Sequence, residues 1–306
     1  INLARGIAKS SGQKNLCLAG GVALNCVANG KLLREKVFDN IWIQPAAGDA
    51  GGAVGAALGA YHWMLGQARK PMTRRDRMRG AYLGPRYETV DIEQRLKAAG
   101  AVFSTVSDAD VIELTAQALA EGKAVGWHQG RMEFGPRALG GRSIIADPRS
   151  PAVQKQLNLK VKYRESFRPF APSVLREDVS DWFDIQTDSP YMLLVADVLK
   201  SHQIPMTPEQ EALFGIEKLN VPRSTLPAVT HVDYSARIQT VHAQTNPRYH
   251  ALISRFKALT GCPVLVNTSF NVRGEPIVST PEDAFHCLMG TEIEFLAVGN
   301  CILRKE

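Results

Sequence analysis

Apolar positions in the N-terminal stretch, residues 1–65, switch twice between the continuous run of a buried strand and the spacing of a helix. Residues 14–19 (KNLCLA) and 41–44 (IWIQ) predict strands, and residues 22–36 and a stretch from about Gly51 predict helices. A glycine-rich turn joins each strand to the following helix. Strands that alternate with helices in this way predict an α/β unit.

The same alternation continues after residue 81 and predicts a second, larger unit. Its predicted helices cover residues 90–99, 108–121 (capped by Asp108), 178–183, 249–259 and 281–289. Its predicted strands cover residues 102–106, 123–128, 169–175, 191–198, 228–231, 236–241, 262–267 and parts of 292–303, whereas 201–221 is polar and irregular. The chain is therefore predicted to be of the α/β (α+β) class.

A basic stretch without apolar periodicity, residues 67–80 (QARKPMTRRDRMRG), separates the two units. A length of 306 residues fits two domains at roughly 150 residues each. We expect a first domain at 1–66, a basic linker at 67–80 and a second domain at 81–306. Because the chain opens with Ile1 inside a helical pattern, we also expect it to be the C-terminal portion of a longer protein or half of a split one.

Amino-acid composition says more about the class of protein and its cellular compartment than about its function. Hydrophobic residues make up 45% and charged residues 22% of the chain, as in ordinary globular proteins. The net charge of +6 is modest for this length and does not by itself favour nucleic acid. Five cysteines without a CxxC pair favour a reduced, cytoplasmic compartment over a disulfide scaffold. No signal peptide is recognisable, and the apolar stretch 50–65 is too short for a membrane span.

Basic residues and glycines are concentrated between Gly130 and Phe170, in GRMEFGPRALGGRSIIADPRS and KYRESFRPF. Glycine lets the backbone approach a ligand closely, and arginine presents a planar fork of donors that fits phosphate or carboxylate. We expect a pocket for a small, highly charged anion; the alternative is a basic surface loop. The basic side chains and the hydroxyl of this segment belong to Arg131, Arg137, Arg142, Arg149, Lys160, Lys162, Arg164, Arg168 and Ser143.

Two glycine-rich turns, LAGGVALN and GDAGGAVG, each lie between a predicted strand and a predicted helix. Such a turn presents backbone N–H groups and the positive end of the helix to phosphate. Tight packing is the alternative, because neither turn matches the GxGxxG or P-loop pattern. Asp49, at the end of the second strand, is a candidate metal ligand, with a helix N-cap as the alternative.

Two polar features interrupt apolar strands further along the chain. Arg237 lies inside the apolar stretch 236–241, where a charge needs a partner or a ligand because an unpaired buried charge is costly. The short polar side chains of NTSFN, residues 267–271, follow a predicted strand, and α/β folds place ligand-binding groups at such strand ends. Both features are candidates for ligand contact.

Three motifs, GRMEFGPRALGGRSI, KYRESFRPFAPSVL and VNTSFNVRGEPIV, make the chain similar to a known family. Together they resemble the C-terminal part of the O-carbamoyltransferases of the nodulation protein U, cephalosporin and tobramycin carbamoyltransferase family. LAGGVALN and GDAGGAVGAAL resemble the end of that family's first domain, so the resemblance spans nearly the whole chain. Two positions depart from the family pattern, since glycine is expected at Tyr234 and asparagine at Gly141.

The resemblance implies a fold and a reaction. The first domain, of which residues up to about Leu65 would be the tail, is expected to be actin/hexokinase-like and related to the universal tRNA threonylcarbamoyl-transfer subunit. The second, from about Ala81, is expected to be a YrdC-like twisted-sheet domain that makes carbamoyl-adenylate from carbamoyl phosphate and ATP. The first domain would pass the carbamoyl group to an acceptor hydroxyl with a divalent metal, iron or magnesium, whose histidine ligands would lie upstream.

The resemblance also implies roles for particular residues. Arginines that hold both anions can stabilise charge that develops in the transition state, and Arg137, Arg168 and Arg237 are expected to be catalytic in this sense. Asp49 matches the metal aspartate. The residues expected to bind carbamoyl phosphate or nucleotide are Gly20, Gly21, Asn25, Arg131, Arg142, Ser143, Lys162, Arg164, Asn267, Ser269 and Asn271.

Two other functions compete with carbamoyl transfer to a small-molecule hydroxyl. An enzyme of tRNA threonylcarbamoylation would use bicarbonate and threonine and would bind RNA through the arginines of residues 67–80. A non-catalytic nucleotide-binding module would bind nucleotide without turnover. The expected partners are a sugar or natural-product acceptor and the missing N-terminal half or a partner chain. Neither a membrane nor a nucleic acid is expected as a partner.

Overall fold

The computed structural model describes residues 1–70 and 76–305. Its strands are β1 (Asn15–Leu18), β2 (Asn40–Ile43), β3 (Ser104–Thr105), β4 (Val125–His128), β5 (Arg142–Ala146), β6 (Ala171–Leu175), β7 (Leu194–Asp197), β8 (Ser235–Val241), β9 (Val264–Ser269), β10 (Phe295–Val298) and β11 (Cys301–Arg304). Its α-helices are α1 (Asn2–Ser11), α2 (Cys26–Arg34), α3 (Asp49–Gly59), α4 (Thr89–Ala98), α5 (Asp108–Ala120), α6 (Pro151–Gln156), α7 (Val179–Trp182), α8 (Pro208–Glu211), α9 (Gly215–Leu219), α10 (Pro247–Thr260) and α11 (Pro281–Met289). Short 3-10 or π turns are η1 (Gly21–Leu24), η2 (Ala60–Met64), η3 (Arg79–Ala81), η4 (Leu157–Val161), η5 (Arg176–Asp178) and η6 (Lys200–His202).

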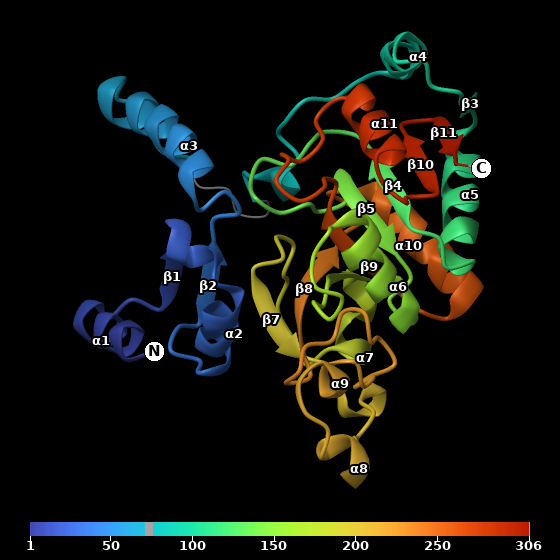
Figure 1. Cartoon of the computed structure of the whole chain (residues 1–306). Helices are drawn as coiled ribbons and strands as arrows, with labels where there is room; N and C mark the ends of the chain where they lie inside the picture. The colour runs from blue at the N-terminus through green and yellow to red at the C-terminus, as the bar shows by residue number, and fades with distance from the viewer. Residues whose placement is uncertain (71–75, 306) are drawn as a thin grey trace.

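A nine-stranded mixed sheet forms the body of the molecule, in the order β3-β11-β10-β4-β5-β9-β6-β8-β7 (Figure 1). The pairs β10–β4 and β6–β8 are parallel, and the other neighbours are antiparallel. This sheet and its helices confirm the α/β class. The YrdC-like and actin/hexokinase-like assignments and the domain boundaries stay predictions.

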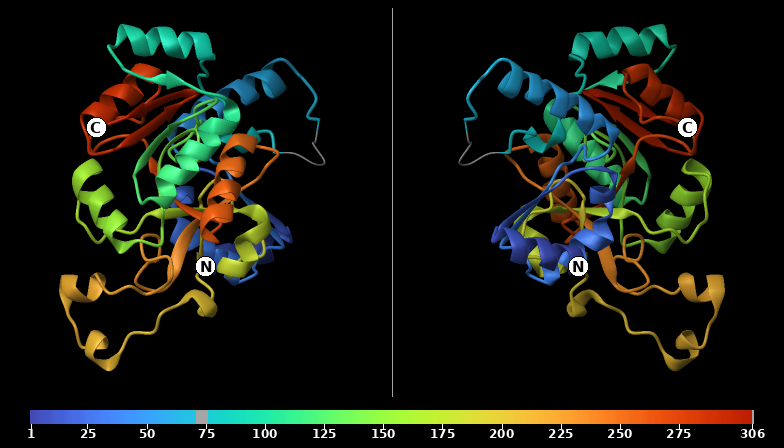
Figure 2. Two further views of the ribbon diagram at one scale, coloured as in Figure 1. Left: turned by 90° about the vertical axis from the view of Figure 1, so that its right-hand side faces the viewer. Right: turned by 90° about the vertical axis from the view of Figure 1, so that its left-hand side faces the viewer.

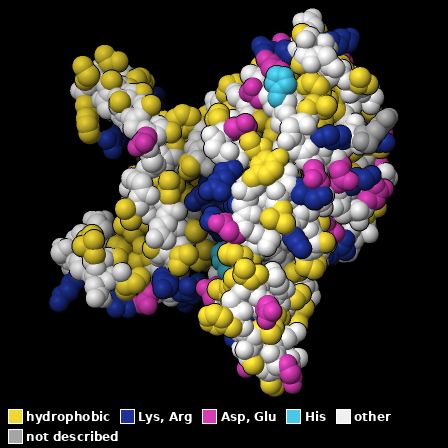
Figure 3. All heavy atoms as spheres, viewed as in Figure 1, with side chains coloured by type: hydrophobic (Ala, Val, Ile, Leu, Met, Phe, Trp, Pro, Cys, Tyr) yellow, Lys and Arg dark blue, Asp and Glu magenta, His cyan; other side chains and the backbone are white. Residues whose placement is uncertain are grey.

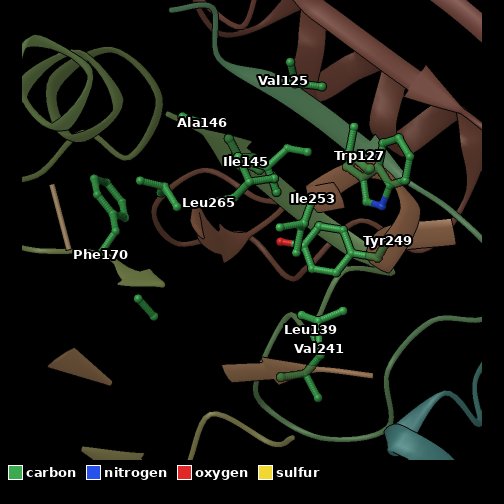
Figure 4. Close-up of a cluster of buried hydrophobic side chains, with 14 of the residues drawn as sticks. Val125, Trp127, Leu139, Ile145, Ala146, Phe170, Val241, Tyr249, Ile253 and Leu265 are labelled. Atoms are coloured by element: carbon green, nitrogen blue, oxygen red, sulfur yellow. The ribbon is translucent and has the colours of Figure 1, made fainter. Parts of the chain in front are cut away.

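Helices pack on the sheet in two groups. α5 and α10 pack against each other and contact strands β4, β6, β9 and β10, while α4 and α11 pack together near β10 and β11. Between α10 and the sheet lies an apolar core in which Trp127, Ile145, Leu265 and Tyr249 are fully buried (Figure 4). Large apolar side chains from strands and helix thus fix the sheet that carries the polar residues described below.

The N-terminal elements form a smaller layer beside the sheet (Figures 1 and 2). β1 and β2 pair in parallel as a two-stranded sheet, and α2 packs against β7 at the edge of the large sheet. Asn29 of α2 donates hydrogen bonds to the carbonyl oxygens of Ala23 and Leu193, so a buried amide joins the two layers. Neither α1 nor α3 buries a residue in the described chain.

Several sequence predictions differ from the structure. The sequence analysis predicted no strand at residues 142–146, which form β5, buried throughout, and the strand predicted at residues 228–231 is absent from the described structure. Ser107, not Asp108, caps α5, because its hydroxyl accepts the N–H of Asp110. The irregular stretch 201–221 contains the short helices α8 and α9. Part of the predicted linker, residues 71–75, lies outside the described residues.

A search of the described residues finds no helix with the length and apolar character that a membrane span requires.

Candidate functional site

A cavity of about 290 Å³ lies where the segment after η4 meets the end of β9. It brings together five of the residues that the sequence predicted, although they lie about a hundred positions apart in the chain. Its wall also includes Thr268 and three residues to which the sequence analysis had assigned no role: Glu165, Val272 and Arg273. The predicted residues in its wall are Lys162, Arg164, Arg168, Ser269 and Asn271.

Lys162 is the most buried cation of this cavity, with 7% of its surface exposed. Its ammonium group donates to the backbone oxygen of Ser269, to Oγ of Ser269 at 3.3 Å and to Oδ1 of Asn271 at 2.9 Å. Burial and the positive charge of Arg164 lower the pKa of Lys162 to about 7. The lysine therefore links the KYRESFRPF segment to the strand end, and an anion bound in the cavity would favour its protonated form.

Two further arginines extend this positive wall. Nε of Arg164 donates to Oδ1 of Asn158 at 2.6 Å, and its guanidinium lies over the ring of Phe170, 4.8 Å from the centroid. Burial, and next the charge of Arg168, lower the pKa of Arg164. Arg168 is half exposed and pairs with Glu165 at 2.8 Å. Packing and hydrogen bonding thus hold Arg164 in a fixed orientation without neutralising it.

Arg137 and Arg237 add two more cations that influence each other. Burial, and next the charge of Arg137, lower the pKa of Arg237 to about 10, and Arg164 contributes in the same direction. Nε of Arg137 is buried and has no hydrogen-bond partner in the described part of the chain. Burial lowers the pKa of Arg137 as well, and the nearby sulfur of Cys26, at the start of α2, opposes the lowering of the pKa at both arginines. These side chains therefore lie close to the N-terminal layer.

Within residues 1–70 and 76–305, no carboxylate lies within ion-pair distance of Arg137, Arg164, Arg237 or Lys162. Lys and Arg side chains gather in the recess between the N-terminal layer and the body of the molecule (Figure 3). Like charges held close together in a partly buried position repel one another and lose hydration. Such an arrangement is favourable once an anion with several oxygens binds, because charge-assisted hydrogen bonds then replace the repulsion.

The glycine-rich loop before β5 does not offer its backbone to a ligand, which corrects the sequence prediction. Oε1 of Glu133 accepts the N–H groups of Leu139 at 2.6 Å and Gly141 at 2.8 Å, and Oγ of Ser143 accepts the N–H of Gly140 at 2.9 Å. The close approach for which glycine is needed is to the chain itself: a Cβ on Gly140 would lie 2.3 Å from the ring of Tyr249. Ser143 therefore supports the loop and is fully buried.

Arg142 was also predicted to bind a ligand, but its guanidinium is fully buried in β5. It donates to the carbonyl oxygens of Gln129 at 3.1 Å, Gly141 at 2.9 Å and Pro85 at 3.2 Å. Burial lowers its pKa to about 10, and the charge of Glu133 opposes this effect. The geometry assigns Arg142 to holding the chain around the loop, not to contacting an anion.

Asn267 and Arg131 are likewise separated from the cavity. Asn267 is fully buried, and its amide donates to the carbonyl of Ala138, Oγ of Ser173 and Oε1 of Gln239. Because β9 continues to Ser269, Asn267 lies inside the strand and not after it. Arg131 donates to the carbonyl of Gly84 and lines a different cavity, of about 500 Å³.

The predicted residues of the first unit lie around the starts of α2 and α3. Oδ1 of Asn25 accepts the N–H of Ala28 at 3.1 Å and so caps α2, while Gly20 has a positive φ of 96°. Gly21 begins η1. Asp49 is exposed and is the first residue of α3, whose N-cap is Gly48, so the N-cap alternative is wrong.

The metal assignment of Asp49 finds no further ligands. The described residues contain no group of three or more His, Cys, Asp or Glu side chains that could hold a metal ion. A single exposed carboxylate does not match the donor number that iron or magnesium requires. The residues present therefore do not form a metal site by themselves, and no step below involves a metal.

Comparisons with known proteins agree on one family. The model described as Carbamoyltransferase C-terminus matches residues 116–305, and the model described as Carbamoyltransferase N-terminus matches residues 2–58. An uncharacterized protein of Synechocystis sp., sll1178, is 62% identical over 100% of this chain and 50% of its own length. Nodulation protein NolO of Bradyrhizobium diazoefficiens is 42% identical over 97% of this chain and 50% of its own length. The chain thus spans about half the length of these relatives.

Among solved structures, full-length HypF in its phosphate- and nucleotide-bound form aligns with a TM-score of 0.39 and 17% identity, over 66% of this chain and 22% of HypF.

Proposed function

Because this chain belongs to the carbamoyltransferase family, we infer that it contributes to ATP-dependent O-carbamoyl transfer and that its arginine-lined recess binds carbamoyl phosphate and ATP. The observation that carries this proposal is the group of cations without a carboxylate partner: Arg137, Arg164, Arg237 and Lys162. Two phosphate-bearing substrates together supply the several negative charges that such a group needs.

The proposed reaction converts carbamoyl phosphate, ATP and water into carbamoyl-adenylate, pyrophosphate and phosphate. Water first cleaves carbamoyl phosphate into carbamate and phosphate. An oxygen of the carbamate then attacks the α-phosphorus of ATP, and the bond from this phosphorus to the pyrophosphate oxygen breaks. Arg137 and Arg237 are suited to hold the two anions together and to stabilise the charge on the leaving pyrophosphate. The cavity wall of Lys162, Arg164 and Arg168 is suited to hold the carbamoyl phosphate dianion.

The second half of the proposed reaction transfers the carbamoyl group to a hydroxyl of a small molecule. AMP is a better leaving group than the oxygen of free carbamate. The acceptor oxygen therefore attacks the carbamoyl carbon of the adenylate, and AMP departs. We place this step at the N-terminal layer, against which the recess opens and which carries Asp49 and the turns at Gly20 and Gly48. The residues that recognise the acceptor and any metal would come from outside the described chain.

An uncovered apolar surface supports a further polypeptide as the proposed partner. Leu3 on α1, Val22 on η1 and Trp63 on η2 are each more than three-quarters exposed. β1 and β2 form a parallel pair, and parallel sheets are normally covered on both faces. The occupant we propose is the remaining portion of the first domain, corresponding to the part of the longer relatives that this chain does not match.

The test is release of pyrophosphate and AMP from ATP with and without carbamoyl phosphate. The chain is assayed alone and together with the unmatched half of the Synechocystis relative. We expect carbamoyl-phosphate-dependent pyrophosphate, reduced at least about 100-fold by Arg137→Ala, since one lost charge-assisted contact in a transition state costs about 3 kcal/mol. Arg149→Ala is the matched control, because Arg149 pairs with Asp147 away from the cavity. Absence of pyrophosphate from both preparations would contradict the proposal.

A further inference from the structure

The loop between β4 and β5 encloses a carboxylate of its own. Glu133 is 7% exposed, and its Oε1 accepts the N–H groups of Leu139 at 2.6 Å, Gly141 at 2.8 Å and, more weakly, Arg142 at 3.4 Å. Successive backbone N–H groups that converge on one point form a site for an anion. Here the side chain of the loop's own glutamate occupies that site, so a phosphate group cannot use it.

Buried side chains from several elements satisfy the carbonyl oxygens of the same loop. The carbonyl of Ala138 accepts from Asn267 at 3.1 Å. The carbonyl of Leu139 accepts from the hydroxyl of Tyr82 at 2.6 Å and from the amide of Gln239 at 2.8 Å. Trp127 donates to the carbonyl of Gly140 at 3.0 Å. The backbone from 138 to 141 is thus held from both sides by hydrogen bonds to buried or half-buried side chains.

Arg137 immediately precedes this fixed backbone and is the loop residue that joins the cation group. Its Nε has no hydrogen-bond partner among the described residues, and its charge lowers the pKa of Arg237. The guanidinium therefore lies near Arg237, and no described residue neutralises its charge. An arginine on an unrestrained loop would move away from Arg237 and into water to relieve the repulsion. Something must therefore hold the loop against that force, and the carboxylate of Glu133 is the charged group that does so.

The loop also reaches the N-terminal layer. Gly135 has a positive φ of 145°, and a Cβ there would lie 2.9 Å from the carbonyl oxygen of Pro45. Pro45 begins the turn that leads into α3, whose first residue is Asp49. The loop is thus held by Glu133 at residues 139–141 and contacts the first unit at Gly135. Arg137 lies in the chain between these two contacts.

We propose that Glu133 is a positioning residue of the anion site, acting as an internal anion that locks the 133–142 loop so that Arg137 is presented to phosphate before a ligand arrives. This role rests on the proposed function of the recess. It assigns Glu133 no contact with substrate. Holding Arg137 in place in advance lowers the conformational cost of binding.

The experiment compares Glu133→Ala, Glu133→Gln, Arg137→Ala and the double variant Glu133→Ala/Arg137→Ala, with Glu121→Ala as a surface control. The probe is inorganic pyrophosphate, titrated by calorimetry into the full chain. We expect Glu133→Ala and Arg137→Ala each to weaken binding about tenfold. The double variant should bind like Arg137→Ala alone, because Glu133 acts through Arg137. Glu133→Gln retains an acceptor oxygen and should stay within about threefold of the wild type.

Amide hydrogen exchange of the peptide covering residues 131–145 gives a second readout that needs no ligand. We expect at least about tenfold faster exchange in Glu133→Ala at Leu139 and Gly141, largely restored in Glu133→Gln. Unchanged exchange would overturn the proposal, as would wild-type binding by Glu133→Ala or a full additional tenfold loss in the double variant. If the wild type itself bound no pyrophosphate, the proposed function would fail, while the exchange result would still decide whether Glu133 locks the loop.

Discussion

Gly30 of α2 lies directly against Val195 of β7, so that a Cβ at position 30 would be 2.5 Å from the carbonyl oxygen of Val195. This contact, together with the two hydrogen bonds of Asn29, joins the N-terminal layer to the edge of the large sheet. The recess with its arginines opens between these two parts. The separation between them at this point is therefore set by the absence of a side chain on Gly30.

Gly30→Ala should consequently push α2 away from β7 and lower the free energy of unfolding by about 1–3 kcal/mol, as overpacking typically does. Gly55→Ala in α3 is the matched control, because nothing lies within 4 Å of its Cβ position. In that helix interior alanine should stabilise by about 0.5–1 kcal/mol. Urea unfolding of both variants measures the difference, and equal effects of the two substitutions would contradict the docking described here.

Tyr234 has a φ of 63°, in the left-handed region that glycine favours. Family resemblance led us to expect glycine at this position, and the backbone conformation explains why. A non-glycine residue there costs about 1–3 kcal/mol. Tyr234→Gly relieves this strain but also loses the contacts of the half-buried ring. The free energy of unfolding should therefore stay unchanged or rise by up to about 1 kcal/mol. Tyr234→Val should destabilise, since a β-branched residue tolerates this conformation least. Chemical denaturation decides, and the reverse order of the two variants would be incompatible with strain.

Arg237→Ala should stabilise the ligand-free protein while it weakens anion binding. The substitution removes a mostly buried charge that Arg137 and Arg164 repel. We expect the free energy of unfolding to rise by about 1 kcal/mol and pyrophosphate affinity to fall by roughly 10- to 100-fold, since a hydrogen bond to a charged group contributes about 1.5–3 kcal/mol.

Arg248 provides the matched comparison for this prediction. Its guanidinium donates to Asp108 at 2.7 Å, to Gln129 at 2.8 Å and to Asn300 at 3.0 Å, so its charge is satisfied within the protein. Arg248→Ala should destabilise by about 1–3 kcal/mol and leave pyrophosphate binding intact. Thermal unfolding with and without pyrophosphate separates the two cases. A destabilised Arg237→Ala protein would mean that Arg237 is a structural arginine.

Lys162 should make stability depend on pH in the alkaline range. Burial lowers its pKa from 10.5 to about 7 in the folded protein. Between these values the unfolded chain holds a proton that the folded chain has released, so this lysine's contribution to stability increases as the pH rises from about 7 to about 10.5. Lys162→Met removes this titrating group. We expect the variant to have a higher free energy of unfolding than the wild type at pH 6.5, and the difference between the two proteins to be smaller at pH 9. Lys160→Met, at an exposed lysine paired with Glu292, should show no such trend.

Local sequence patterns predicted many of the helices and strands and the two halves of the cavity wall. Helix α11 has the predicted bounds, since Thr280 caps it and Pro281 occupies its first turn. KYRESFRPF and the end of NTSFN were predicted to contribute to one site, and Lys162 lies against Ser269 and Asn271. Charge and polarity at strand and helix ends were sufficient here, because the two segments meet directly through the hydrogen bonds of Lys162.

The same patterns failed where the partners come from distant parts of the chain. A glycine-rich loop signals close approach of something to the backbone, and the sequence does not say whether that is a ligand or the protein itself. Here it is the ring of Tyr249 and the carboxylate of Glu133. Arg142 and Asn267 were expected to bind a ligand because their types suit phosphate, but long-range packing buries both. Arg137, by contrast, keeps a buried Nε that has no hydrogen-bond partner among the described residues.

The measurement that tests the central claim most directly is a crystal structure of this chain with ATP. If the recess is the substrate site, phosphate oxygens should lie within hydrogen-bonding distance, about 2.7–3.2 Å, of the guanidinium groups of Arg137 and Arg237. Phosphates bound elsewhere, for example in the cavity lined by Arg131 and Arg248, with Arg137 and Arg237 still without an anion, would contradict the account.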